Sequence, residues 1–215
     1  MISPNSTLLF MGDSITDCGK DVQGELTPWS TGTGLGRGYV ALVNAGLTTA
    51  RPADRIRVIN KGVGGRTVRD IKANWENEVT ANKPNWLSLM IGINDVWRQF
   101  DCPLRKETHV NLSEYETTLD ALLAKTRPTL DGLVLVTPFL IESNKQDAMR
   151  IVMDQYGAAM KKLATKHNAI LVDTQAAFDE LTAHRHPMEI AWDRIHPDLV
   201  GHTLLAKAWL KAVGY

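Results

Sequence analysis

The order of apolar and amphipathic segments along this chain predicts an α/β fold built on a five-stranded parallel sheet. Five short runs are nearly continuously apolar and contain many β-branched residues, as expected of strands. Amphipathic segments of helical length separate them, so strand and helix alternate, which is typical of right-handed crossovers between parallel strands. A length of 215 residues fits one domain, and we expect a single domain over 1–215.

The predicted strands are covered on both sides. They span residues 8–11, 56–59, 86–91, 133–136 and 169–172. Only the second contains a charged residue, Arg57, and none alternates cleanly between apolar and polar positions. Strands with one face in water show such alternation, so these runs indicate a sheet between two layers of helices.

The segments between the strands predict the helices. They cover 39–50, 67–79, a stretch from Ser113 onward, 149–167, 174–183 and 197–214. Ser113 and Glu116 have the spacing of a capping box, which predicts Ser113 as a helix N-cap. Pro197 fits the first turn of the last helix. Trp75 and Trp209 lie on apolar helix faces and are expected in the core.

A long loop is predicted inside the first crossover. Residues 32–38 are rich in glycine and lie between the first strand and the first long helix. We expect an active-site loop there rather than a domain boundary, because the loop interrupts one crossover. Trp29, in the same loop, is a candidate to line the site or an interface.

The composition excludes several classes of protein. Hydrophobic residues are 44% and charged residues 22% of the chain, which is near the globular average and unlike disordered or collagen-like chains. Lysine plus arginine and aspartate plus glutamate both number 24, so the net charge is zero. Nucleic-acid-binding proteins usually carry a basic excess, so we expect no nucleic-acid partner.

Cysteine content and the first residues bear on the compartment. Cys18 and Cys102 are too few for a disulfide framework and predict free thiols in a reducing compartment. Residues 1–5 lack the pattern of a signal peptide, and no run of 18 apolar residues occurs. We therefore expect a cytoplasmic protein with no membrane partner. The sequence leaves the formation of a homo-oligomer open.

Polar residues follow the predicted strands where ligands bind to parallel sheets. The pair Asp13-Ser14 follows the first strand, Gly65 lies in the turn after the second, and Asn94 follows the third. The segment with Asp193 and His196 comes before the last helix. Because the carboxyl ends of parallel strands meet at one edge, we expect these segments to converge there.

Ser14, His196 and Asp193 supply the groups that nucleophilic hydrolysis requires. A serine hydroxyl is a weak nucleophile until a base takes its proton, and the imidazole of His196 can act as that base. Asp193 lies three residues before His196, so its carboxylate can reach the Nδ1 proton and orient the ring. The alternatives are that Ser14 is only a helix N-cap and His196 only a surface histidine.

Three donors could stabilise the oxyanion of an acyl-transfer intermediate. They are the backbone N–H groups of Ser14 and Gly65 and the side-chain amide of Asn94. The alternatives are a tight turn that needs glycine at positive φ and an Asx-turn at Asn94-Asp95. These turn roles are compatible with donation, so they do not compete strongly with it.

Four separated motifs together resemble, in order, the sequence blocks of the SGNH (GDSL) hydrolases: Gly12-Asp13-Ser14, Gly65, Gly92-Ile93-Asn94-Asp95 and Asp193-x-x-His196. The resemblance implies a three-layer α/β/α sandwich of flavodoxin-like type, a serine esterase site, and no metal or other cofactor. It also implies the roles of the residues already singled out: Ser14 as nucleophile, Ser14, Gly65 and Asn94 as oxyanion donors, His196 as base and Asp193 as its orienting group.

Within that family the chain looks most similar to the intracellular acetylxylan esterase, or carbohydrate acetylesterase, branch. The similar stretches are 12–19, 90–98 and 191–197. The similarity implies hydrolysis of acetyl esters on sugars or xylo-oligosaccharides, so the expected partner is a small-molecule or oligosaccharide ester. Gly64 and Arg66 depart from the usual pattern, and Arg66 is expected to alter the charge near the substrate.

Asp13, Trp97 and Trp192 adjoin predicted catalytic residues and are candidates for substrate binding. Aromatic faces can stack on sugar rings, and Trp97 with Trp192 could close an acyl pocket around an acetyl group. The main alternative is a broad-specificity GDSL lipase, acylhydrolase or thioesterase that accepts longer acyl chains.

Other functions are less consistent with the sequence. No G-x-S-x-G elbow of an α/β-hydrolase lipase occurs, and the glycines of 32–38 lack dinucleotide-binding spacing. A metal hydrolase could use His184, His186 and His202 with the Asp193–His196 segment, but no H-E-x-x-H motif occurs. A non-enzymatic carbohydrate-binding protein is the remaining alternative.

Overall fold

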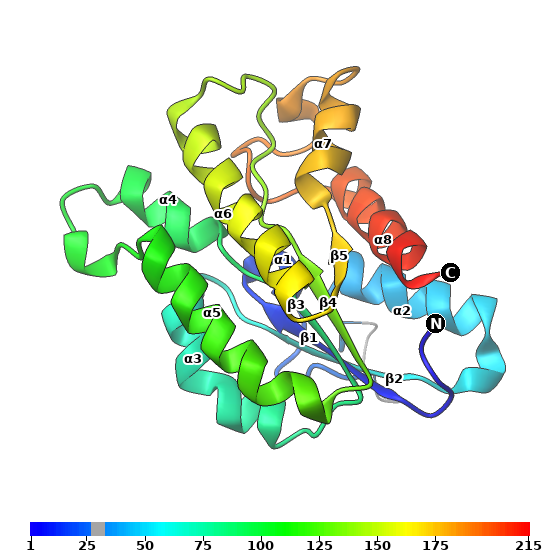
Figure 1. The fold of residues 1–215 in the computed structure, drawn as a ribbon. Coiled ribbons are helices and arrows are strands. Elements are labelled where there is room, and N and C mark those ends of the chain that lie inside the picture. The colour runs from blue at the N-terminus through cyan, green and yellow to red at the C-terminus, as the bar shows by residue number, and fades with distance from the viewer. Residues whose placement is uncertain (27–32) are drawn as a thin grey trace.

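The five strands of the described chain form one parallel sheet. A computed structural model describes residues 1–26 and 33–215. The strands are β1 (Thr7–Gly12), β2 (Arg57–Gly62), β3 (Trp86–Met90), β4 (Gly132–Val136) and β5 (Ile170–Val172). Their order in the sheet is β2-β1-β3-β4-β5, the flavodoxin-like order (Figure 1). The predicted fold class is therefore confirmed.

Helices cover both faces of the sheet. They are α1 (Ser14–Asp17), α2 (Tyr39–Ala50), α3 (Val68–Trp75), α4 (Ile93–Asp101), α5 (Leu112–Thr126), α6 (Ala148–Lys166), α7 (Thr174–Thr182) and α8 (Leu199–Val213). Helices α3, α5 and α6 pack side by side on one face, and α2 packs against α8 on the other (Figure 1). Within the described residues, no helix is long and apolar enough to cross a membrane.

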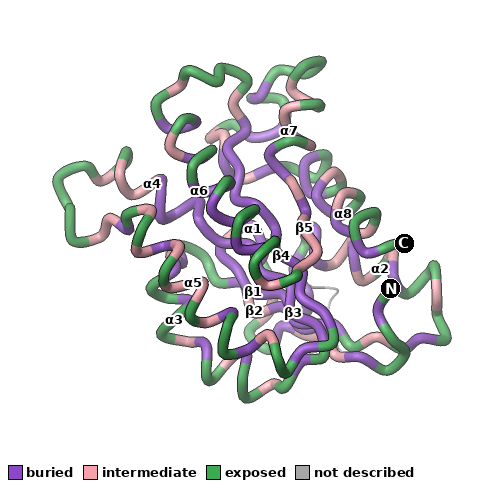
Figure 2. Tube along the Cα trace, viewed as in Figure 1, coloured by how far each residue is buried: buried purple, intermediate pink, exposed green. Residues whose placement is uncertain are grey.

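The core lies along the strands, between the two helical layers. Figure 2 shows β1, β3 and β4 as continuously buried, whereas β5 at the edge of the sheet is only partly buried. Trp75 and Trp209 are fully buried, as expected from their helix faces. Each indole N–H has a partner, because Trp75 donates to Thr126 Oγ1 at 2.9 Å and Trp209 to Ser88 Oγ at 3.0 Å. Burial of large rings with satisfied polar groups stabilises both layers.

The register brings the carboxyl ends of the strands level with one another. Gly12 pairs with Gly62 on one side and Met90 on the other, Met90 pairs with Val136, and Val136 pairs with Val172. The carboxyl ends of these strands therefore lie along one edge of the sheet, and the segments that follow them begin there. The order of the strands reverses between β1 and β3, which is where parallel sheets of this type bind ligands.

Two glycines let the first helical turn sit directly on the strand ends. A Cβ atom on Gly12 would lie 2.3 Å from Thr16 Oγ1, and one on Gly62 would lie 2.3 Å from the backbone nitrogen of Asp17. Neither distance leaves room for a side chain. The absence of side chains at these positions therefore fixes the place of α1, which begins with Ser14.

Two predicted helix starts are wrong by a few residues. Asn111, not Ser113, caps α5, because its Oδ1 accepts a hydrogen bond from the backbone N–H of Glu114 at 2.9 Å. Asn111 and Ser113 have equivalent spacings to a glutamate, and the sequence alone does not choose between them. Pro197 lies before the N-cap of α8, which is Asp198.

Helix α4 was not predicted from the sequence. Its first turn contains Asn94 and Asp95, residue types that favour turns, and it follows a glycine at positive φ. The signal that could have found it is the spacing of Ile93, Val96 and Phe100, which places apolar side chains on one helical face. The Asx-turn interpretation of this segment is therefore wrong.

The described part of the glycine-rich loop supports α1. In residues 33–38, the backbone N–H of Arg37 donates to the carbonyl of Cys18 at 2.9 Å, and the carbonyl of Leu35 accepts from Asn60 Nδ2 at 2.9 Å. Gly32 and Trp29 lie outside the described residues, so their predicted positions near the site stay predictions.

Candidate active site

Ser14 lies at the point where β1 ends and α1 begins. The side chain of Asp13 caps this helical turn by accepting a hydrogen bond from the backbone N–H of Ile15 at 3.0 Å. Asp13 is 1% exposed, whereas Ser14 is half-buried. The strand end and the cap together hold the hydroxyl of Ser14 at the carboxyl edge of the sheet.

The hydroxyl of Ser14 contacts His196, which contacts Asp193. Ser14 Oγ lies 2.8 Å from His196 Nε2, and His196 Nδ1 lies 2.6 Å from Asp193 Oδ2. When Nδ1–H donates to the carboxylate, the neutral imidazole offers the lone pair of Nε2 to the serine O–H. The structure thus brings together three residues separated by up to 182 positions in the sequence.

The carboxylate of Asp193 is held in its ionised form. Burial raises its pKa, but hydrogen bonds from the side chain and backbone of His196 and the backbone of Ile195 more than offset this, so the pKa is lowered overall. The backbone donors lie 2.9 Å and 3.0 Å from Oδ1. A negative charge is therefore present beside Nδ1, where it stabilises an imidazolium.

Arg194 ties this segment to the connection between β4 and α6. Its carbonyl accepts a hydrogen bond from the backbone N–H of Ile141 at 2.9 Å, and its Nη1 lies 2.9 Å from Glu142 and 3.0 Å from Asp147. Arg194 has a φ of 66°, a left-handed conformation that is unfavourable for a side chain of this size. These contacts offset the strain and hold the segment that carries Asp193 and His196 against the connection between β4 and α6.

Gly65 and Asn94, two of the predicted oxyanion donors, lie in or against the loop that passes Ser14. Gly65 has a φ of 80°, and a Cβ on the preceding Gly64 would lie 3.9 Å from Ser14 Cβ, so this loop passes beside the serine. Asn94 is 2% exposed in the first turn of α4. Its Nδ2 donates to the carbonyl of Arg66 at 3.0 Å, and the amide group carries a second N–H.

Asp95 connects the two segments that carry Gly65 and Asn94. Its Oδ1 accepts a hydrogen bond from the backbone N–H of Val68 at 2.9 Å, at the start of α3. The side chain is fully buried, and its Oδ2 has no partner among the described residues. Burial raises the pKa of Asp95 to about 7. Asp95 belongs to the third of the four sequence motifs, but no role was predicted for its side chain.

Asp13 lies below the surface of the site. Burial raises its pKa to about 7, although the hydrogen bond from Ile15 and the nearby His196 lower it in part. Its known partner is the backbone of α1. A direct contact between Asp13 and a substrate stays a prediction, and the burial of the side chain does not favour it.

Arg66 does not alter the charge at the edge of the site, contrary to expectation. Its guanidinium forms two hydrogen bonds with Glu78, at 2.6 Å and 2.8 Å, and a third with the carbonyl of Lys61 at 3.0 Å. Its side chain is largely buried. Glu78 therefore neutralises this charge inside the fold, and only the backbone of Arg66 reaches Asn94.

The two tryptophans predicted to bind substrate differ in position. The ring of Trp97 lies 6.0 Å from that of His196 in an edge-on arrangement, and the guanidinium of Arg98 lies 4.6 Å from the centre of the Trp97 ring. Trp192 is 81% exposed. Trp97 therefore borders the site, whereas a wall formed by Trp192 stays a prediction.

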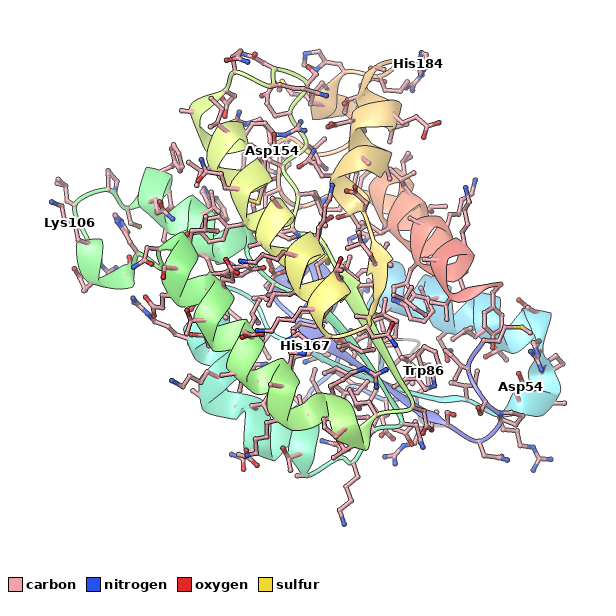
Figure 3. All side chains as sticks on the ribbon, viewed as in Figure 1. Asp54, Trp86, Lys106, Asp154, His167 and His184 are labelled. Carbon is pink, nitrogen blue, oxygen red and sulfur yellow. The ribbon has the colours of Figure 1, made fainter. Side chains whose placement is uncertain are left out.

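The three histidines considered for a metal site have other surroundings. His184 projects outward beyond the end of α7 (Figure 3). His186 caps a short turn by accepting the backbone N–H of Met188 at 3.2 Å. His202 is buried between Cys18 and Tyr39, and burial lowers its pKa to about 4. Over residues 1–26 and 33–215, no three His, Cys, Asp or Glu side chains form a metal-binding group.

Comparisons with known proteins agree with this geometry. Residues 10–204 match the model of the GDSL-like Lipase/Acylhydrolase family. The chain is 51% identical, over 100% of its length and 96% of the relative, to an acetylxylan esterase of Geobacillus stearothermophilus.

Solved structures are similar over the same length. A crystal structure of Axe2, the acetylxylan esterase from that organism, is 52% identical with a TM-score of 0.95, covering 100% of this chain and 96% of that one. Three related structures are described as catalytic mutants of Axe2, in which a serine, a histidine or an aspartate is replaced by alanine.

A second solved relative comes from an environmental sample. LAE5, described as an alpha/beta hydrolase enzyme from the metagenome of Lake Arreo in Spain, is 49% identical with a TM-score of 0.95, covering 99% of this chain and 97% of that one. With the family model matched from 10 to 204 and half of all residues shared with full-length relatives, this chain belongs to the GDSL-like lipase/acylhydrolase family, the SGNH hydrolases, and is a carboxylic ester hydrolase of that type.

Proposed function

We propose that this protein removes acetyl groups from acetylated xylo-oligosaccharides through an acetyl-enzyme formed on Ser14. The observation that carries the proposal is the 2.8 Å contact between Ser14 Oγ and His196 Nε2, with Asp193 bound to the other ring nitrogen. Support for the substrate comes from relatives described as an acetylxylan esterase and an acetyl-xylooligosaccharide esterase.

Acylation begins with transfer of the Ser14 proton to His196 Nε2. Oγ attacks the acetyl carbonyl carbon, and the carbonyl oxygen becomes an oxyanion. The backbone N–H groups of Ser14 and Gly65 and the free N–H of Asn94 donate to this oxygen. The tetrahedral intermediate then breaks its bond to the sugar oxygen, which takes the proton from His196.

Deacylation repeats these steps with water. His196 takes a proton from the water, whose oxygen attacks the acetyl group on Ser14. Collapse of the second intermediate returns a proton to Ser14 Oγ and releases acetic acid, which ionises at neutral pH. The ionised Asp193 stabilises the imidazolium in both halves of the reaction.

The first experiment tests the nucleophile. We expect acetate release from acetylated xylo-oligosaccharides by the unaltered protein and covalent labelling of Ser14 by a phosphonate. Ser14→Ala should abolish both while keeping the circular dichroism spectrum unchanged. Ser113→Ala, an exposed serine in the first turn of α5, is the matched control. Full hydrolysis by Ser14→Ala would rule out this mechanism and would require another nucleophile.

The second experiment tests the acyl group. Trp97 borders His196 with its ring edge-on, so we expect acetyl esters to be preferred. In a pocket open to long chains, each added methylene would contribute about 0.8 kcal/mol of burial, and activity would rise with chain length. A series of p-nitrophenyl esters from acetyl to octanoyl, compared by kcat/KM, separates the two. A maximum at hexanoyl or longer would favour the lipase or thioesterase alternative.

The proposed compartment is the cytoplasm. Cys18 and Cys102 form no disulfide in the described part of the chain, and free thiols are typical of reducing compartments. Fractionation of the producing cells, with acetylesterase activity as the marker, tests this. Activity found outside the cells would contradict it.

A further inference from the structure

A cavity lies beside the proposed catalytic residues and has no part in the mechanism above. Its volume is about 240 Å³. Its lining includes Trp97, Phe100 and Asp101 of α4, Asp147 and Met149 at the start of α6, and Arg194. We call these six residues the α4–α6 cleft. Helices α4 and α6 pack against each other at this edge of the sheet (Figure 1).

The cleft adjoins the site through two of its residues. Trp97 is shared, because its ring also lies 6.0 Å from that of His196. Arg194 lies between Asp193 and Ile195 in the segment that carries His196. A molecule whose ester is held at Ser14 can therefore extend past Trp97 into the cleft.

The lining combines apolar rings with hydrogen-bonding groups. Phe100 is 39% exposed, an unusually accessible position for a phenylalanine, and Trp97 is half-buried. Asp147 uses Oδ1 to cap α6 and Oδ2 to pair with Arg194, and Asp101 pairs with Arg98. Each carboxylate can accept further hydrogen bonds, since its oxygens together offer about four acceptor sites.

This combination suits a neutral sugar better than other ligands. A pyranose has C–H faces that pack on aromatic rings and hydroxyl groups that donate to carboxylates. Each carboxylate of the cleft is paired with a guanidinium, Asp147 with Arg194 and Asp101 with Arg98, so the lining has no excess of positive charge to favour an anionic ligand. A long acyl chain would cover these paired charges and exclude water from them, which is unfavourable.

We propose that the α4–α6 cleft binds the xylose unit adjacent to the one whose acetyl ester is hydrolysed, an inference that rests on the proposed function. Its volume is 240 Å³, below the roughly 300–1,000 Å³ of pockets for drug-sized ligands, and is appropriate for a single ring. Binding energy from this remote unit would favour oligosaccharides over acetylated xylose.

The test compares substrates of different length. The readout is the ratio of kcat/KM for acetylated xylotriose to kcat/KM for p-nitrophenyl acetate, which is too small to reach the cleft. Aromatic contacts contribute roughly 0.5–1.5 kcal/mol, so Phe100→Ala should lower this ratio by roughly 2- to 12-fold. Phe100→Tyr should restore it. Leu104→Ala, an exposed residue just beyond α4, is the control and should leave the ratio unchanged.

Each contrary result has a distinct meaning. Equal losses on both substrates in Phe100→Ala would show a structural role and overturn the proposal, as would an unchanged ratio. A selective loss with p-nitrophenyl octanoate would assign the cleft to the acyl chain instead.

A binding experiment separates this proposal from the proposed function. Calorimetric titration of unacetylated xylotriose into Ser14→Ala protein should show binding that is roughly 2- to 12-fold weaker in Ser14→Ala/Phe100→Ala. Binding of this kind without any deacetylation by the unaltered protein would contradict the function but not the sugar site. Absence of binding, together with efficient deacetylation, would overturn the sugar site alone.

Discussion

The two halves of the candidate site are held in place by different kinds of structure. Ser14 and Asn94 lie in the first turns of the helices that follow β1 and β3, whose ends lie level in the sheet. Asp193 and His196 lie in an irregular segment between α7 and α8. The first half is positioned by the register of the sheet, and the second by individual hydrogen bonds.

The neighbours of the two halves differ accordingly. Asp13 and Asp95, beside the sheet half, are fully buried carboxyls whose pKa values burial raises to about 7. Arg194, in the loop half, is about one-third exposed and held by Glu142 and Asp147. Changes near the sheet half should therefore alter folding stability, whereas changes in the anchors of the loop should alter the rate of catalysis with little effect on stability.

The largest expected effect on kcat comes from replacing the residues that link the two halves, Ser14 and His196. Ser14→Ala and His196→Ala should each lower kcat by roughly 10⁶-fold, because nucleophile and base act as a unit. The double variant should be no worse than either single one. Steady-state kinetics on p-nitrophenyl acetate measure all three. If the two losses instead multiplied, Ser14 and His196 would act independently and the contact between them would not be the catalytic one.

Asn94→Ala tests the sheet half alone. The amide is expected to act on the developing oxyanion, so kcat should fall by roughly 10²–10³-fold with little change in KM. The same kinetic assay applies, with thermal unfolding as a check that α4 is intact. A rise in KM at constant kcat would make Asn94 a ground-state binding residue.

Glu142→Gln tests the loop half. It removes one of two acidic partners of Arg194 and leaves Asp147 in place. The pair is partly exposed, so its loss should cost less than about 1 kcal/mol of unfolding free energy. A shift of His196 by less than 1 Å should lower kcat by less than about 10²-fold. A large fall in the melting temperature with unchanged kcat would show that the anchors of the loop act on stability rather than on catalysis, contrary to the difference proposed between the halves.

Asp95→Asn tests the stability of the sheet half, and its effect depends on pH. The carboxyl ionises near 3.8 in the unfolded chain, but burial raises its pKa to about 7 in the fold. Between these values the folded state holds the proton more tightly, so this group's contribution to stability falls as pH rises from about 4 to 7. Asparagine does not ionise and keeps the oxygen that accepts from Val68.

The measurement is the difference in unfolding free energy between the Asp95→Asn variant and the unaltered protein at pH 5 and pH 8. The variant should gain on the order of 1–2 kcal/mol relative to the unaltered protein as pH rises. A difference independent of pH would mean that Asp95 is ionised in the fold throughout this range.

Much of the architecture could be predicted because it depends on local patterns. The apolar runs that became β1, β3 and β4 are covered on both sides, and their continuity along the chain indicates this directly. The spacing of Asp193 and His196 is also local, and their contact forms within a single turn of loop. The order of the motifs then indicated which segments meet at the edge of the sheet.

Contacts between distant segments were decided by the tertiary structure. The sequence determined that Arg66 carries a charge, but its pairing with Glu78 depends on how the helical turn after α3, residues 76–80, packs against the loop after β2. Likewise, the exposure of Trp192 and the cleft beside Trp97 depend on how α4 meets α6. Residue type and periodicity indicate burial and local hydrogen bonding. Pairing between distant side chains depends instead on how whole helices pack, and the pattern of a single segment does not contain that information.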